Sequence, residues 1–169
     1  MDATFFSRHI APILLLSAGK DSAACMWLLQ PLWGRIVFVW ANPGDPEPLA
    51  IEYMKHVRAL VPNFVELTGS IVREANPWAC CSRNLWSLLA EAQAAPGVTG
   101  CIAGVKKCDT LRSPVHQPGA VLNGVEHAFP VWDWTDDEVI QFLGDRLPPS
   151  YAQGHKTSLD CAGCTAWSH

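Results

Sequence analysis

The feature that most constrains the fold is a short apolar run followed at once by a small polar loop and a helix-forming segment. Pro12–Leu16 is apolar throughout, which is typical of a buried strand. The loop Ser17–Ser22 follows, and Asp21–Gln30 then carries apolar side chains at helical spacing until Pro31 stops the helix. A strand, a loop and a helix in this order predict an α/β protein.

The same alternation of strands and helices continues along the chain. In chain order, the further strands and helices that we expect are Ile36–Trp40, Leu49–Leu60, Phe64–Leu67, Asn84–Ala94 and Cys101–Gly104. Another helix should begin after Thr135, since Thr135 and Glu138 have the spacing of a capping box. We therefore predict a three-layer α/β fold, with a mostly parallel sheet between helices on both faces. No repeat or long linker divides the chain, so residues 1–169 should form a single domain.

Composition limits the partners of the protein. Asp and Glu number 16 and Lys and Arg number 12, which gives a net charge of −4. An acidic chain provides no general attraction for nucleic acid, although a local basic pocket for a phosphorylated small molecule is compatible with this balance. No apolar run approaches the roughly 20 residues of a membrane span, and no secretory signal is recognisable. We expect a cytoplasmic protein that does not bind membranes.

The loop Ser17-Ala-Gly-Lys-Asp-Ser22 has the chemistry of an anion site. Gly19 lets the backbone approach a ligand closely, and the amides of Asp21 and Ser22 should face outward at the positive end of a helix. Lys20 adds a positive charge. The segment lacks the glycine spacing of both the nucleotide-triphosphate P-loop and the dinucleotide fingerprint. An ordinary strand–turn–helix junction with polar caps is the alternative.

Four of the seven cysteines occur as two pairs. Cys80 and Cys81 are adjacent, and Cys161 and Cys164 form a C-x-x-C pair 80 positions later, counted from 81 to 161. Adjacent cysteine side chains normally diverge, which suits a wide target such as a 4Fe–4S cube better than a single ion. A zinc site, a disulfide or unrelated buried cysteines are the alternatives. Ser17–Ser22 should lie outside the carboxyl ends of the strands, where ligands of parallel sheets bind.

Several segments resemble a known family. Ser17–Ser22 resembles the PP-loop of the ATP pyrophosphatase (adenine nucleotide alpha hydrolase-like) superfamily, usually Ser-Gly-Gly-x-Asp-Ser, with Ala18 in place of the first glycine. Together with the cysteine pairs, it resembles the assimilatory adenylyl-sulfate (APS) and phosphoadenylyl-sulfate (PAPS) reductases. Further segments similar to that family are Gly104–Arg112, Phe129–Val139, Leu147–Gly154 and Ser158–Thr165. The resemblance runs from about residue 12 to residue 165.

The resemblance implies a role for each motif. The loop would bind the phosphate or sulfonated end of an adenine nucleotide (APS, PAPS or ATP) through Ser17, Ala18, Gly19, Lys20, Asp21 and Ser22. Lys106 and Arg112 would face the sulfate or an extra phosphate, and Asp45 would contact adenosine. The 4Fe–4S cluster would be held by Cys80, Cys81, Cys161 and Cys164. A thioredoxin-like thiol donor would complete the reduction of activated sulfate to sulfite.

One part of the family pattern is missing. Reductases of this family use a cysteine in a C-terminal tail as nucleophile, whereas this sequence has five residues and no cysteine after Cys164. Cys108 is the candidate replacement, because Lys106 and Lys107 beside it would favour the thiolate. Cys25 and Cys101 fall in a helix and a strand and should belong to the core.

Three functions remain open at this point. The first is a sulfonucleotide reductase. The second is a PP-loop ATP pyrophosphatase that uses Mg²⁺ and transfers sulfur to nucleic acid. The third is a non-catalytic nucleotide-binding module. The eight tryptophans are compatible with apolar faces that pair two copies in a homodimer.

Overall fold

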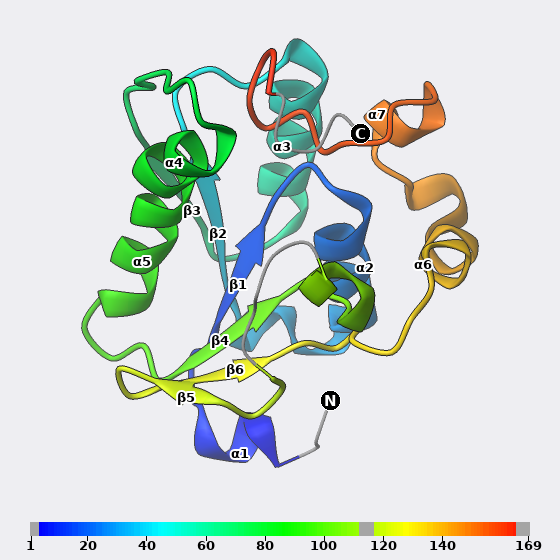
Figure 1. Ribbon diagram of the computed structural model, residues 1–169. Helices are drawn as coiled ribbons and strands as arrows, with labels where there is room; N and C mark the ends of the chain where they lie inside the picture. Colours follow the sequence, from blue (N-terminus) through cyan, green and yellow to red (C-terminus); the bar gives the residue numbers. More distant parts are fainter. Residues whose placement is uncertain (1–3, 112–116, 165–169) are drawn as a thin grey trace.

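A computed structural model describes residues 4–111 and 117–164. Its centre is a six-stranded sheet in the order β3-β2-β1-β4-β6-β5, parallel except for the edge strand β5 (Figure 1). The strands are β1 (Ile13–Leu16), β2 (Val37–Asn42), β3 (Phe64–Thr68), β4 (Gly100–Ala103), β5 (Val121–Leu122) and β6 (Val125–Ala128).

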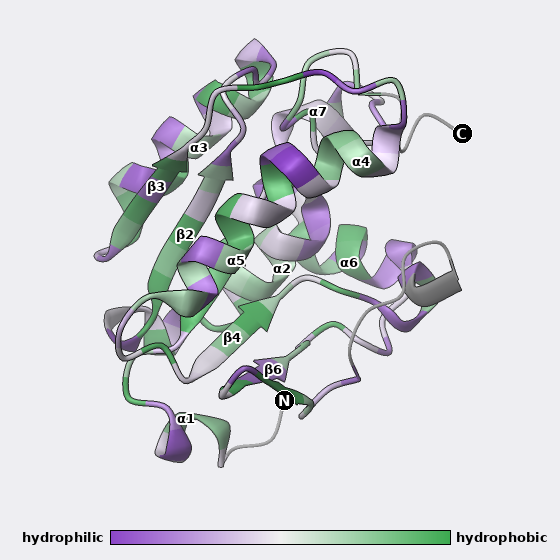
Figure 2. Cartoon of the chain, turned by 60° about the vertical axis from the view of Figure 1, so that its left-hand side comes forward, coloured by the Kyte–Doolittle hydropathy of each residue, from purple (hydrophilic) through white to green (hydrophobic). Residues whose placement is uncertain are grey.

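Helices cover both faces of the sheet, which confirms the predicted three-layer α/β fold. The α-helices are α1 (Phe5–Arg8), α2 (Lys20–Leu28), α3 (Pro48–Leu60), α4 (Pro77–Cys81), α5 (Ser87–Ala94), α6 (Asp136–Leu143) and α7 (Pro149–Ala152). Short 3₁₀ segments are Gln30–Arg35, Lys107–Leu111 and Gly144–Arg146. Figure 2 shows α5 in front of the sheet and α2 behind it. None of the helices in the described part of the chain has the length and apolar character needed to cross a membrane.

The side chains of β1 explain why this strand is apolar at every position. Leu14 and Leu16 enter the larger core cluster, which also contains Met54 from α3. Ile13 points the opposite way and packs with Ala92 of α5 in a second cluster. Successive strand residues face opposite sides of a sheet, so a central strand between two helical layers has no face left for polar residues.

The order of the strands determines where a ligand has room. β1 pairs with β2 on one side and with β4 on the other, so the chain reverses its direction of progress across the sheet at β1. In open parallel sheets, ligands bind in the crevice outside the carboxyl ends of the strands at this switch point. The segments that follow β1 and β4, Ser17–Gly19 and Gly104–Lys106, meet at this crevice.

The predicted strands and helices all form, with ends shifted by a few residues. The short helices α1 and α7 were not predicted, and two further features differ. The hairpin β5–β6 was not predicted, although its Asn123-Gly124 turn, with positive φ at both residues, is a strong hairpin signal. The helix expected from Asn84 begins earlier, at Pro77. Asn76 caps it by accepting hydrogen bonds from the Trp78 and Ala79 amides.

Candidate functional site

The loop Ser17–Ser22 closes on itself and presents the first turn of α2. The Ser22 hydroxyl donates to the Ser17 carbonyl oxygen at 2.7 Å, and the Gly19 amide donates to Ser17 Oγ at 3.2 Å. Gly19 is the N-cap of α2, so the Lys20, Asp21 and Ser22 amides have no acceptor within the helix. They stand at the positive end of the helix dipole, where an anion is favoured.

Ala18 replaces the first glycine of the PP-loop pattern without backbone strain. Among the described residues, the non-glycine residues with positive φ are Asn123 and Leu159. Ala18 therefore occupies a conformation open to any L-residue. Its side chain is buried.

Two lysines and two aspartates form a compact cluster beside this loop, which we call the Lys–Asp cluster: Lys20, Asp21, Lys106 and Asp136. Lys106 Nζ lies 2.9 Å from Asp21 Oδ1 and 2.9 Å from Asp136 Oδ1. Lys20 Nζ lies 3.0 Å from Asp21 Oδ2 and 2.8 Å from Asp136 Oδ1. The structure thus brings Lys106 to the loop, as the resemblance implied, and adds Asp136, which sequence reasoning missed.

The protonation states of the cluster follow from these contacts. Burial opposes the charged form of Asp136, but the hydrogen bonds and charges of Lys20 and Lys106 outweigh it and lower the Asp136 pKa to about 2. Burial would also lower the Lys106 pKa, whereas Asp21 and Asp136 raise it above its ordinary value. The two lysines and two aspartates give the cluster a formal charge of zero.

Tyr151 of α7 closes the other side of the loop. The Lys20 ammonium lies 5.8 Å from the centre of its ring. Burial and the charge of Asp21 raise the Tyr151 pKa to about 12, so the phenol is neutral and able to donate a hydrogen bond. The resemblance included the segment Leu147–Gly154, but sequence reasoning gave Tyr151 no role in the site.

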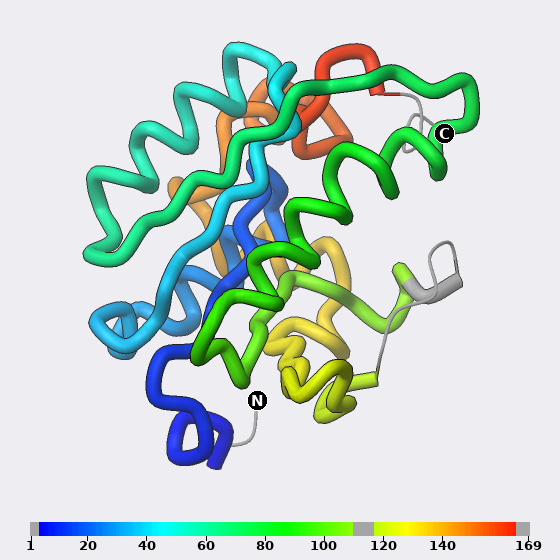
Figure 3. The backbone as a smooth tube through the Cα atoms, turned by 90° about the vertical axis from the view of Figure 1, so that its left-hand side faces the viewer, coloured from blue at the N-terminus to red at the C-terminus, as the bar shows by residue number. Residues whose placement is uncertain are grey.

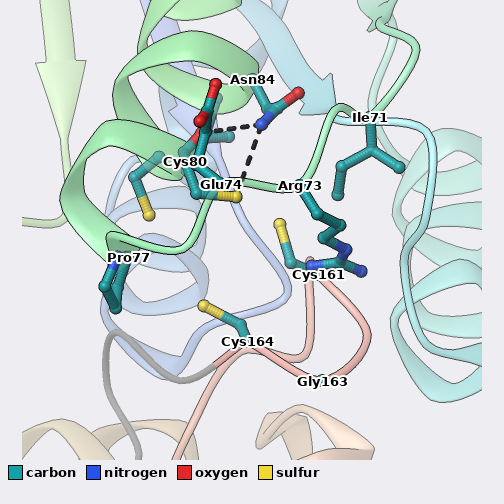
Figure 4. A pocket seen from close by; sticks show the side chains of 11 residues that line it. Ile71, Arg73, Glu74, Pro77, Cys80, Asn84, Cys161, Gly163 and Cys164 are labelled. Carbon is teal, nitrogen blue, oxygen red and sulfur yellow. Dashed lines mark hydrogen bonds between the residues drawn. The ribbon is translucent and has the colours of Figure 1, made fainter.

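The four paired cysteines lie together around one cavity of about 80 Å³. Figure 4 shows the sulfurs of Cys80, Cys161 and Cys164 directed toward a common space, and Cys81 also lines this cavity. All four are free thiols. The two pairs come from α4 and from the segment before the C-terminus, which lie side by side at the top of Figure 3.

The helix that carries Cys80 and Cys81 continues through a π-helical segment, Ser82–Trp86, into α5. Its buried Asn84 donates to the Val72 carbonyl oxygen at 2.9 Å and the Cys80 carbonyl oxygen at 2.8 Å, and its Nδ2 lies 3.5 Å from Cys80 Sγ. Asn84 also accepts from the Val72 amide at 2.8 Å. Single π-turns inside helices often occur at functional sites, and here the turn directs Asn84 toward a candidate ligand.

The thiols perturb one another. Burial, together with Cys164 and Cys80, raises the Cys81 pKa to about 11. Burial, together with Cys164, Asp160 and Cys81, raises the Cys161 pKa to about 12, partly offset by the nearby Arg73 guanidinium. Both thiols are therefore protonated at neutral pH in the ligand-free site, and a bound metal centre would displace their protons.

No single-ion site is evident in this arrangement. Within residues 4–111 and 117–164, no three His, Cys, Asp or Glu side chains stand close enough together to hold one metal ion. The four thiols around the cavity are the candidate ligands of the predicted metal centre.

Asp160 connects the cysteine cavity to the loop. This buried carboxylate accepts hydrogen bonds from the Ala18 amide at 3.0 Å and from Trp40 Nε1 at 3.3 Å, and it immediately precedes Cys161. Burial raises the Asp160 pKa, while hydrogen bonds from Ser158, Ala18 and Trp40 act in the opposite direction. Sequence reasoning missed Asp160, and its partner Trp40 is a buried residue of β2.

The remaining predicted residues lie apart from these two groups. Asp45 pairs with Arg73, and its carbonyl oxygen accepts from the Ala162 amide at 2.7 Å, so it braces the cysteine segment. Its contact with adenosine stays a prediction. Cys108 is exposed, next to Lys107 in a 3₁₀ turn. Arg112 lies outside the described residues. Cys25 and Cys101 are buried, as expected.

Comparison with known proteins supports the fold. The structure is similar to the crystal structure of PAPS reductase from Candida auris in complex with phosphate, with a TM-score of 0.63. The alignment covers 88% of this chain and 80% of that chain at 11% sequence identity. The chain has a PAPS reductase-like fold. No protein-family model matches the sequence, and no curated protein matches it.

Gly104 should be essential for the crevice, because it packs directly on the loop backbone. A Cβ at this position would lie 2.4 Å from the Asp21 carbonyl carbon and 2.4 Å from the Ser22 nitrogen. We expect Gly104→Ala to lower the free energy of unfolding by about 3 kcal/mol, measured by urea denaturation. Gly34→Ala is the matched control, since its Cβ would meet nothing within 4 Å. Equal stability of the two variants would contradict the close packing.

Asp160 should contribute more to stability than an exposed aspartate. Asp160→Ala would leave the buried Ala18 and Trp40 donors without their acceptor, and we expect a loss of about 3 kcal/mol. Asp45→Ala removes a half-exposed ion pair and should cost less than about 1 kcal/mol. Urea denaturation of both variants under reducing, metal-free conditions makes the comparison. Similar losses would show that Asp160 does not tie the two segments together.

Proposed function

We propose that the protein is a sulfonucleotide reductase: it binds APS or PAPS at Ser17–Ser22, beside a 4Fe–4S cluster held by Cys80, Cys81, Cys161 and Cys164, and reduces the activated sulfate to sulfite. The observation that carries this proposal is the convergence of two remote thiol pairs on one cavity that Asp160 joins to the anion-binding loop. A PAPS reductase-like fold is consistent with it.

The donor set supports an iron–sulfur cluster over zinc. The four thiols are free and surround a common cavity. A cube has separate iron corners and accepts both members of an adjacent cysteine pair. Asn84 Nδ2 near Cys80 Sγ and Arg73 near Cys161 offer the hydrogen bonding and positive charge that stabilise thiolate ligands. When bound, the cluster would supply a redox-active centre beside the nucleotide.

The loop and the Lys–Asp cluster support binding of the anionic end of the substrate. Helix amides and two ammonium groups meet in the crevice between β1 and β4. The similar structure from Candida auris is a phosphate complex of a PAPS reductase, and this is consistent with an anion site in a protein of this fold. The neutral Tyr151 hydroxyl beside Gly19 is a further donor toward the same space.

The chemistry needs two thiols. A thiolate attacks the sulfate sulfur and the S–O bond to the nucleotide phosphate breaks, so the nucleotide leaves with the bonding electrons and a thiosulfonate forms. A second thiolate then attacks the thiol sulfur of this intermediate, which releases sulfite and leaves a disulfide. We assign the first thiol to Cys108, which is exposed and two residues from Lys106, and the second to a thioredoxin-like donor.

The Lys–Asp cluster favours this function over magnesium-dependent chemistry on ATP. The carboxylates of Asp21 and Asp136 accept hydrogen bonds from Lys20 and Lys106, so they act as partners of ammonium groups. A magnesium site instead offers free carboxylate oxygens to the ion.

Metal analysis tests the cluster. Protein purified without oxygen should be brown, with about four iron atoms and four sulfides per chain, and Cys161→Ser should lose most of both because one iron corner loses its thiolate. Cys108→Ser is the matched control and should keep its iron, since Cys108 does not line the cavity. Colourless protein with one zinc per chain would refute the cluster.

Sulfite release tests the reaction. With reduced thioredoxin, the protein should release sulfite from APS or PAPS, and Cys108→Ser should lower the rate at least about 100-fold while nucleotide affinity stays within about threefold. Full sulfite release by Cys108→Ser would remove this cysteine from the reaction. Pyrophosphate release from Mg-ATP without any sulfite would replace the proposed function by that of an ATP pyrophosphatase.

A further inference from the structure

We propose that Asp136 is a specificity-determining residue of the nucleotide site: in the free protein its carboxylate occupies the place between Lys20 and Lys106 that an anionic oxygen of the substrate takes on binding. This inference rests on the proposed function, because it assigns the two ammonium groups to the substrate's anionic end. An anion then binds between Lys20 and Lys106 only by displacing the carboxylate of Asp136, which the chain holds in place.

The geometry is that of an internal anion. A single oxygen, Asp136 Oδ1, lies 2.8 Å from Lys20 Nζ and 2.9 Å from Lys106 Nζ. These three residues come from three separate segments, α6, α2 and the loop after β4. One oxygen shared between two ammonium groups is also how a phosphate or sulfate oxygen would be bound at this point.

Exposure distinguishes the two carboxylates of the Lys–Asp cluster. The side chain of Lys106 is 3% exposed and that of Lys20 is 10% exposed, so the ammonium groups are at the base of the crevice. Asp21 is 21% exposed and belongs to the loop itself, whereas Asp136 is 64% exposed and contacts both ammonium groups. Asp136 is therefore the more accessible of the two carboxylates to a ligand that arrives from solvent.

The backbone of Asp136 is fixed although its side chain can turn away. Thr135 and Glu138 form a complete capping box around it, with the Thr135 amide donating to Glu138 at 2.7 Å and the Glu138 amide donating to Thr135 at 3.2 Å. Displacement of the carboxylate needs only a side-chain rotation into water, without unfolding of α6. Lys20 and Lys106 lower the pKa of Asp136 to about 2 in the free protein, so an anion that approaches the two ammonium groups at neutral pH meets a charged carboxylate there.

The Asp136 carboxylate should discriminate between small inorganic anions and the larger nucleotide. It is always present at high effective concentration, so a small inorganic anion that contacts only the two ammonium groups competes poorly. A nucleotide makes additional contacts with the loop and the crevice, and these offset the displacement of Asp136. Asp136 should thus keep inorganic phosphate, sulfate and the product sulfite from occupying the site.

Asp136→Asn tests this role because asparagine keeps the shape and the oxygen acceptor but removes the charge. Asp137→Asn is the matched control: Asp137 is the next residue, is exposed, and is also in the first turn of α6. Binding of inorganic pyrophosphate to full-length protein is measured by calorimetry. We expect Asp136→Asn to bind pyrophosphate about tenfold more tightly than wild type, and Asp137→Asn to bind it within about twofold of wild type.

If Asp136 had only a structural role, Asp136→Asn would not gain affinity for pyrophosphate. If Asp136 only fastened α6 to α2, Asp136→Asn would lower the melting temperature and bind pyrophosphate equally or more weakly, which overturns the proposal. An equal gain in both variants also overturns it, because a general change of charge would then explain the effect.

Binding of APS to wild type separates this inference from the proposed function. If wild type binds APS but Asp136→Asn gains no pyrophosphate affinity, the inference fails and the proposed function stands. If Asp136→Asn gains affinity but no variant releases sulfite from APS or PAPS, the inference stands and the reductase function fails. If no variant binds either ligand, both fail.

Discussion

The buried carboxylate of Asp160 is the interaction on which the rest of the site depends. It accepts the amide of Ala18 in the loop after β1 and the indole of Trp40 in β2, and its own chain continues directly into Cys161. A buried carboxylate with several donors is costly to break, so it fixes one geometry between segments 142 residues apart. The C-x-x-C pair is thereby held at the same end of the sheet as the anion-binding loop.

Two regions of different chemical character result, one of buried thiols and one of paired charges. Around the cysteine cavity, thiols are buried among each other and their pKa values are raised, which is a state that a metal centre relieves by taking the protons' place. In the crevice between β1 and β4, two ammonium groups are balanced by two carboxylates. The first region suits a permanent inorganic group and the second suits an anion that comes and goes. The reductase that we propose would use both, with a cluster that stays bound and a nucleotide that exchanges.

The sequence predicted what local patterns and spacing determine. The continuous apolar run before Ser17 and the capping box at Thr135 are local signals, and both elements form where they were expected. The two cysteine pairs were recognised as one group from residue type and spacing, and the structure brings them to one cavity. The family resemblance predicted that Lys106 belongs to the site, whereas composition alone gave this residue no role.

Residues whose role depends on tertiary packing were not predictable. Asp136 is the first residue of an ordinary helix, and only the packing of α6 against α2 brings it to Lys20 and Lys106. The sequence predicts Asn84 only as the first residue of a helix. The π-turn that directs its side chain toward Cys80 has no clear sequence signal. The contact of Asp45 with adenosine, which the family resemblance implies, stays a prediction; in the structure Asp45 contacts Arg73 and Ala162.

The central claim is that one inorganic centre and one adenylate occupy adjoining sites joined by Asp160. A crystal structure of the anaerobically purified protein with APS, including anomalous scattering data at the iron absorption edge, tests it most directly. The account predicts an iron cluster bonded to all four paired cysteines, and the sulfonated phosphate end of APS at Lys20 and Lys106 with Asp136 turned away. Iron absent from the four sulfurs, or APS bound away from the loop, would contradict it.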